Sequence, residues 1–126
     1  MTANLLLTYP EFFTCGVAGG PVMDWSLYEV MYTERYMQTP YKNHEGFKQT
    51  NLNNKVESLN SKLLIIHGLL DDVVVIQHSL KFIENCIEKN IPIDFFIYPN
   101  HAHNVRGKDR LHLIQKVINY IIENNK

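Results

Sequence analysis

The sequence is poor in the features that would place it outside the ordinary globular proteins. It has only two cysteines, Cys15 and Cys86, in 126 residues, and we expect both thiols to be free rather than joined in a disulfide. Its net charge of −1 gives no electrostatic reason to bind nucleic acid or an anionic membrane surface. No apolar run is long enough to cross a bilayer. With 45% hydrophobic residues, the chain is typical of one folded domain with a modest core.

A further absence concerns catalysis. An apolar run at Lys62–His67 is followed by Asp71, and a second apolar run at Ile93–Tyr98 is followed by His103. Both runs predict buried parallel strands, and open α/β sheets place their chemistry at the carboxyl ends of such strands. An acid followed by a histidine is also the chain order of α/β-hydrolases, in which a serine in Gly-x-Ser-x-Gly comes first. No such motif occurs in this chain, so we expect a catalytic acid and base without their nucleophile.

The remaining pattern alternates strands with helices. This order implies right-handed crossovers and a parallel sheet, so the expected fold class is α/β, with about three parallel strands and flanking helices. A short strand is expected at Phe13–Gly19, and helices are expected at Thr2–Thr8, Val74–Lys89 and Arg110–Asn124. The helix at 74–89 has a helical spacing of apolar residues at Ile76, Leu80, Ile83 and Ile87. Short helical turns are expected within Trp25–Met37 and Tyr41–Leu59.

Asp71 and His103 are the candidate acid and base. A histidine can act as a general base near neutral pH, and a carboxylate beside it fixes its tautomer. From the pattern alone, an equally weighted alternative is that Asp71 caps the helix that follows it while His103 is an ordinary loop residue. Asp72 is one residue closer to that helix and is the better capping candidate, which leaves Asp71 for the histidine.

Other histidines suggest less. His101 and His103 form a His-x-His pair, but no third ligand lies at a recognised spacing, so we expect neither a metal nor a cofactor. His67 ends a buried strand and is expected to be a structural residue with satisfied ring nitrogens.

An aromatic segment follows the first predicted strand. Its side chains could form the walls of an apolar pocket that suits a compact group such as a proline ring, or they could simply pack in the core. Glu29 lies among these aromatics and would need a partner if buried, either Arg35 or the positive group of a ligand. The candidate pocket residues are Val22, Trp25, Tyr28 and Tyr32.

If the chain is part of a larger domain, the strand near Cys15 has lost a neighbour. Its unpaired backbone groups would then form an open edge. We therefore expect the chain to associate with a second copy through this edge.

Several segments together resemble one enzyme family. They are Gly16–Trp25, Tyr32–Met37, Ile65–Gly68 with Asp71, and Tyr98–Asn104. In combination they resemble the C-terminal catalytic domain of the prolyl oligopeptidase family of serine peptidases, and the dipeptidyl peptidase IV branch in particular. Residues 71–79 and 101–105 are most similar to bacterial prolyl tripeptidyl aminopeptidases.

The resemblance implies a role for each matching residue. Asp71 matches the triad acid and His103 the triad base, while Glu29 matches a carboxylate that holds the free amine of the substrate. Val73 stands where dipeptidyl peptidase IV usually has an asparagine, which favours release of tripeptides. Val22, Trp25, Tyr28, Tyr32 and Val74 match the walls of the proline pocket.

The family places its serine in Gly-Trp-Ser-Tyr-Gly-Gly, shortly before a segment like Met1-Thr-Ala-Asn-Leu. Residues 1–126 are thus expected to be the C-terminal part of an α/β-hydrolase domain, without the nucleophile or the family's propeller. The resemblance implies a parent peptidase that releases short peptides by cleavage after proline, and a 126-residue chain that is inactive alone. By analogy, the bacterial relatives are periplasmic or exposed at the cell surface. Two alternatives stay open: an esterase of the same fold, and a non-catalytic interaction module.

Overall fold

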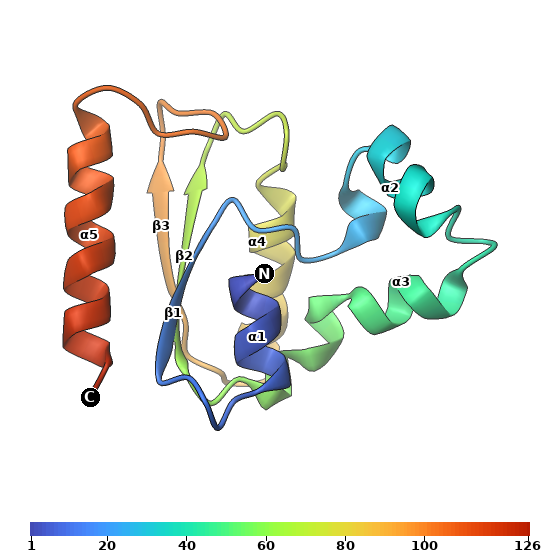
Figure 1. Cartoon of the computed structure of the whole chain (residues 1–126), viewed down its shortest axis with the longest axis horizontal. Coiled ribbons are helices and arrows are strands. Elements are labelled where there is room, and N and C mark those ends of the chain that lie inside the picture. The colour runs from blue at the N-terminus through green and yellow to red at the C-terminus, as the bar shows by residue number, and fades with distance from the viewer.

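The computed structural model describes all 126 residues, which form a three-stranded parallel sheet with helices on both faces (Figure 1). The strands are β1 (Cys15–Gly19), β2 (Lys62–Gly68) and β3 (Asp94–Tyr98), in the spatial order β1-β2-β3. Both strand pairs are parallel. The expected α/β class and the three expected strands are confirmed.

The helices also follow the expected order along the chain. The helix after β2 begins later than expected, however, because the backbone N–H groups of Val73 and Val74 donate to the Asp71 carboxylate instead of starting the helix. No helix combines the length and the apolar composition needed to cross a membrane. The helical elements are α1 (Thr2–Thr8), η1 (Trp25–Leu27), α2 (Val30–Met37), α3 (His44–Thr50), η2 (Leu52–Ser58), α4 (Gln77–Glu88) and α5 (Asp109–Asn124).

Two apolar cores lie on opposite faces of the sheet, and β2 contributes to both. Leu63 and Ile65 belong to the core formed with α1, η2 and α4. Leu64 and Ile66 belong to the smaller core under α5. Because successive side chains of a strand point to opposite faces, a strand covered on both sides is apolar at nearly every position. This explains the continuous apolar run from which β2 was predicted.

The apolar residues whose spacing predicted α4 are not the ones that it buries most deeply. Leu80 and Ile87 are exposed, whereas Ile76 and Ile83 are partly buried. The residues buried against the sheet are His78, Ser79, Phe82 and Cys86. Several faces of this helix carry apolar residues, and the periodicity alone could not select the one that packs. Two polar side chains of α4, those of His78 and Ser79, are therefore buried in the interior.

Residues 20–59 leave the sheet after β1 and return before β2, carrying α2 and α3 away from it (Figure 1). The base of this excursion is fixed by two hydrogen bonds. Leu52 N–H donates to the Met23 carbonyl at 2.9 Å, and the Asn51 amide donates to Asp24 Oδ2 at 2.8 Å. These bonds hold the start of the aromatic segment, at Met23 and Asp24, close to the end of β1.

One edge of β1 is open. Thr14 and Gly20 bond toward β2, so the alternation of a parallel ladder turns the backbone groups of Cys15, Val17 and Gly19 outward. These outward groups have no hydrogen-bond partner in the chain. Cys15 and Cys86 are both free thiols, and burial raises the pKa of Cys86 to about 11.

We expect the chain to self-associate through this β1 edge, because the outward groups can pair with another strand. Sedimentation velocity in reducing buffer, which prevents a Cys15 crosslink, should show association that grows with concentration. Val17→Pro removes an outward N–H without touching the β1–β2 ladder and should weaken the association. A wild-type chain that stays monomeric at all concentrations would contradict this expectation.

Candidate active site

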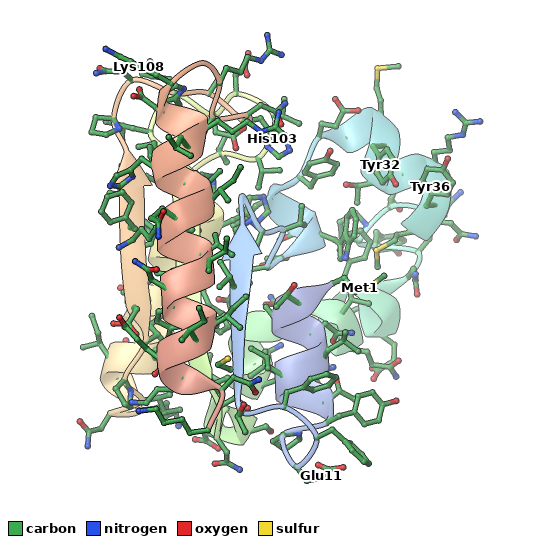
Figure 2. All side chains as sticks on the ribbon, turned by 60° about the vertical axis from the view of Figure 1, so that its left-hand side comes forward. Met1, Glu11, Tyr32, Tyr36, His103 and Lys108 are labelled. Atoms are coloured by element: carbon green, nitrogen blue, oxygen red, sulfur yellow. The ribbon has the colours of Figure 1, made fainter.

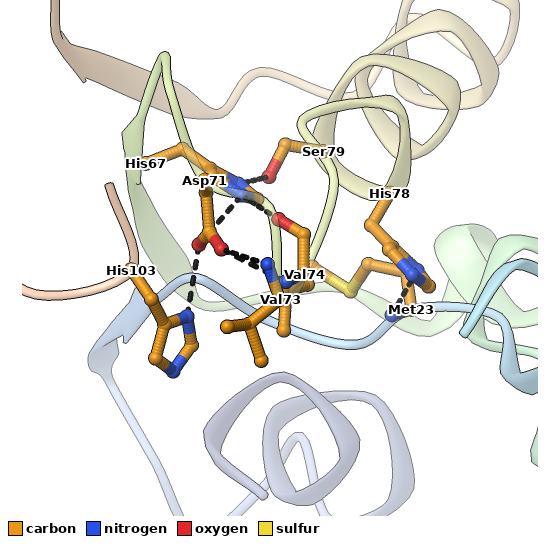
Figure 3. A network of polar contacts seen from close by, with 8 residues as sticks. All are labelled: Met23, His67, Asp71, Val73, Val74, His78, Ser79 and His103. Carbon is orange, nitrogen blue, oxygen red and sulfur yellow. Dashed lines mark hydrogen bonds and ion pairs between the residues drawn. The ribbon is translucent and has the colours of Figure 1, made fainter. Parts of the chain in front are cut away.

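The loops after β2 and β3 bring Asp71 and His103 into direct contact. His103 Nδ1 lies 2.9 Å from Asp71 Oδ2 (Figure 3). The Asp71 side chain is fully buried, whereas 37% of the His103 side chain is exposed. The carboxylate is therefore shielded while the imidazole remains accessible, as a proton-transferring histidine must be.

Asp71 is held by more than His103. Its Oδ1 accepts hydrogen bonds from the backbone N–H groups of Val73 at 3.0 Å and Val74 at 2.8 Å. Burial by itself raises the pKa of Asp71, but the bonds from Val74, His103 and Val73 outweigh it, so the pKa lies below the ordinary 3.8. Asp71 thus orders the turn before α4 with one oxygen and receives His103 with the other. Asp72 is exposed and caps nothing, so the expectation that it caps α4 is wrong.

This geometry fixes what His103 can do. Because Nδ1 faces the Asp71 carboxylate, which can only accept, the neutral ring carries its hydrogen on Nδ1 and donates a hydrogen bond to Asp71. Nε2 is then left with a free lone pair that can accept a proton from a nucleophile. The arrangement is that of a general base supported by a carboxylate.

Gly68 makes the contact possible, although the sequence pattern gave it no role of its own. The loop after β3 lies directly on it: a Cβ at position 68 would come within 2.1 Å of the Ala102 carbonyl oxygen. Two hydrogen bonds join the loops at this point, from Leu69 N–H to the Tyr98 carbonyl and from Leu70 N–H to the His101 carbonyl, each at 3.0 Å. Gly20 is a second missed residue, because a Cβ there would come within 3.2 Å of the His103 ring.

His101 and His103 turn to different partners. His101 Nε2 lies 2.9 Å from Asp109 Oδ2 at the start of α5, and its Nδ1 accepts from the Arg106 N–H at 3.4 Å. His101 therefore ties the loop to α5 instead of sharing a ligand with His103. No group of three His, Cys, Asp or Glu side chains lies in a position to hold a metal ion.

A cavity of about 920 Å³ opens beside His103. Among the expected pocket residues, it is lined by Val22, Trp25, Tyr28 and Val74. Tyr32 is not in the lining, but its ring stacks on Trp25 with centroids 6.0 Å apart, and it lies with Tyr36 on α2 (Figure 2). Met1 lines the same cavity, so the start of the chain lies at the candidate site.

Glu29 does not lie in an apolar environment. The residue is exposed, and it makes no ion pair with Arg35, whose guanidinium lies 5.6 Å from the Tyr36 ring centroid. Because Glu29 is exposed, water can solvate its carboxylate, and the condition of burial under which it would need Arg35 does not apply.

His78 on α4 binds the backbone at the start of the aromatic segment. It is fully buried on α4, and its Nδ1 accepts from the Met23 N–H at 3.3 Å. Its Nε2 has no hydrogen-bond partner. Burial lowers the pKa of His78 below the ordinary 6.5, against the opposing charge of Asp24. The neutral ring is the form that the structure accommodates.

Gly68→Ala should displace the loop that carries His103, because the new Cβ would collide with the Ala102 carbonyl. Overpacking of this kind typically costs about 1–3 kcal/mol of unfolding free energy. Urea unfolding of the chain measures the cost. Gly19→Ala is the matched control, since a Cβ there has nothing within 4 Å, and equal losses for both variants would contradict the loop contact.

Acid should destabilise the chain partly through His78. A depressed pKa means that the unfolded chain binds this proton more readily, so the stability from neutral His78 is lost as pH falls below about 6.5. One such group contributes a slope of at most about 1.4 kcal/mol per pH unit. Urea unfolding from pH 7 downward should show a smaller slope for His78→Gln than for wild type.

His44→Gln, which alters an exposed histidine, is the control for this measurement and should keep the wild-type slope. An unchanged slope in His78→Gln would show that His78 has no part in the acid sensitivity.

The chain matches the model of the prolyl oligopeptidase family over residues 1–126. It is 32% identical over 124 residues to a dipeptidyl peptidase family member of Caenorhabditis elegans, covering 96% of this chain and 15% of the relative. It is 40% identical over 98 residues to an Aspergillus oryzae protein named as a dipeptidyl-aminopeptidase B, and the match covers 75% of this chain and 11% of the relative. The chain thus spans only a small part of the length of these relatives.

Two solved structures are similar to most of the chain. A crystal structure from Bacteroides ovatus, described as a candidate dipeptidyl aminopeptidase IV, is 52% identical with a TM-score of 0.97, and the match covers 98% of this chain and 18% of that one. Porphyromonas gingivalis dipeptidyl peptidase 4 is 36% identical with a TM-score of 0.86, over 89% of this chain and 16% of that one. The chain has the strand arrangement of an α/β-hydrolase and belongs to the prolyl oligopeptidase family.

Proposed function

We propose that this chain is the C-terminal part of the catalytic domain of a serine exopeptidase that releases short N-terminal peptides by cleavage after proline. Asp71 is the triad acid and His103 the general base of this enzyme. The observation that carries the proposal is the 2.9 Å contact between a buried carboxylate and an accessible imidazole, at the mouth of an aromatic-walled cavity.

In the proposed mechanism, His103 Nε2 removes the proton from a serine hydroxyl as the serine attacks the scissile carbonyl. The imidazolium that forms keeps its bond to Asp71, whose negative charge stabilises it. The same proton is then given to the leaving amine. The low pKa of Asp71 suits this role, because the carboxylate stays ionised through the cycle.

The nucleophile is proposed to reach the site from the N-terminal side of Met1. Met1 and His103 line one cavity, so a serine a few residues upstream in a longer protein would lie within reach of the imidazole. The 126 residues alone contain no Gly-x-Ser-x-Gly and are proposed to be inactive.

The cavity beside His103 is proposed to accept the proline ring of the peptide substrate. Val22, Trp25, Tyr28 and Val74 would contact the ring, while Tyr32 would support Trp25 by stacking. Exposed Glu29 would bind the free amine of the substrate as a charged pair. Aromatic walls give a rigid apolar site of the kind that favours a compact ring.

Peptide p-nitroanilides with proline before the chromophore test this proposal. The longer gene product that includes these residues should hydrolyse them and should reject a leucine analogue, and the 126-residue chain should give no turnover. Asp71→Asn in the longer protein should lower kcat by up to about 10⁴-fold, because the histidine loses the partner that fixes its tautomer.

Asp72→Asn is the matched control, since Asp72 is adjacent but exposed and unbonded, and it should keep wild-type kcat. A longer protein whose serine is replaced and which binds proline peptides without turnover would favour the interaction module. Preferred hydrolysis of simple esters would favour the esterase.

A further inference from the structure

We propose that His67 and Ser79 are positioning residues that hold Asp71 in the orientation that receives His103. The inference rests on the proposed function in one respect, since it takes the Asp71–His103 pair to be the acid and base of the reaction. Neither residue touches His103 or the cavity, so both act through Asp71.

His67, at the end of β2, joins three groups within one buried network (Figure 3). Its Nε2 lies 2.7 Å from the Val74 carbonyl oxygen and 3.5 Å from Asp71 Oδ2. Its Nδ1 lies 2.7 Å from Ser79 Oγ on α4. The side chains of His67 and Asp71 are both completely buried, and Ser79 is too, so water cannot replace any of these bonds.

The partners determine the tautomer of the His67 ring. Nε2 faces two acceptors, a carbonyl and a carboxylate, so it must carry hydrogen and donate it. Nδ1 of the neutral ring is then an acceptor, and the Ser79 hydroxyl is the donor that satisfies it. Ser79 thus selects the form of His67 that can bond to the Asp71 turn.

The network closes on itself through the Asp71 turn. Val74 N–H donates to Asp71 Oδ1, and the Val74 carbonyl accepts from His67. The backbone of Val74 therefore links the Asp71 carboxylate, through its N–H, to the His67 imidazole, through its C=O. If the proton of His67 moved to Nδ1, its Nε2 lone pair would face two oxygens, and the resulting repulsion would turn Asp71 away from His103.

Tautomer populations of the histidines test this inference on the 126-residue chain itself. Long-range ¹⁵N–¹H correlation at about pH 8, where histidines are ordinarily neutral, distinguishes the two forms of each ring. Wild type should show His67 with hydrogen on Nε2 and His103 with hydrogen on Nδ1. Ser79→Ala should change the His67 ratio about fivefold, as expected for losing one ordinary hydrogen bond, and should lower the Nδ1–H form of His103 with it.

Ser79→Thr keeps the hydroxyl and should restore both ratios. Ser61→Ala is the matched control. Ser61 is also buried, but it precedes β2 at the opposite end of the sheet, and its hydroxyl donates to the Phe13 carbonyl. If Ser79→Ala does not fold, Ser79→Cys, which keeps the volume with a weak donor, must shift both rings in the same direction.

The inference is overturned if His67 responds to the Ser79 variants and His103 does not. It is also overturned if Ser61→Ala moves His103 equally, or if the wild-type chain lacks the stated tautomers. The proposed peptidase activity is judged separately by turnover of the longer protein, so an inactive protein with the stated tautomers would refute the function and leave the positioning role intact.

Discussion

The site depends on one buried carboxylate. Asp71 is removed from water, and such a charge is stable only where hydrogen bonds replace its lost hydration. Val73, Val74 and His103 supply those bonds. The same bonds shape the turn before α4 and delay the start of that helix. The need to hydrogen-bond the buried Asp71 carboxylate therefore shapes both the turn after β2 and the candidate acid–base pair.

The rest of the site is arranged around that turn by close packing of loops and by α4. Gly68 lets the loop after β3 lie on the loop after β2, so the acid and base come together without long side chains. His78 and Ser79 are consecutive on α4, and they contact the root of the aromatic segment and the His67 network respectively. One buried helical turn thus supports both the pocket wall and the acid.

The sequence predicted the strands well because β2 and the runs beside it are apolar and bounded by glycine or proline. It predicted the meeting of Asp71 and His103 because neighbouring parallel strands end at the same sheet edge. It did not show which face of α4 would be buried, because several faces of this helix carry apolar residues. It failed on Asp72, because capping depends on where a helix starts, and α4 starts only at Gln77, beyond the reach of the Asp72 side chain.

The sequence by itself determined the class of fold and the order of its elements, and it indicated Asp71 and His103 as a candidate pair. These follow from periodicity and chain order, which are local properties. Only the tertiary structure decided that Asp71 is buried while His103 is accessible, that Glu29 is solvated, and that Ser79 reaches His67. Burial and side-chain partners depend on which surfaces meet, and residues distant in the chain determine this.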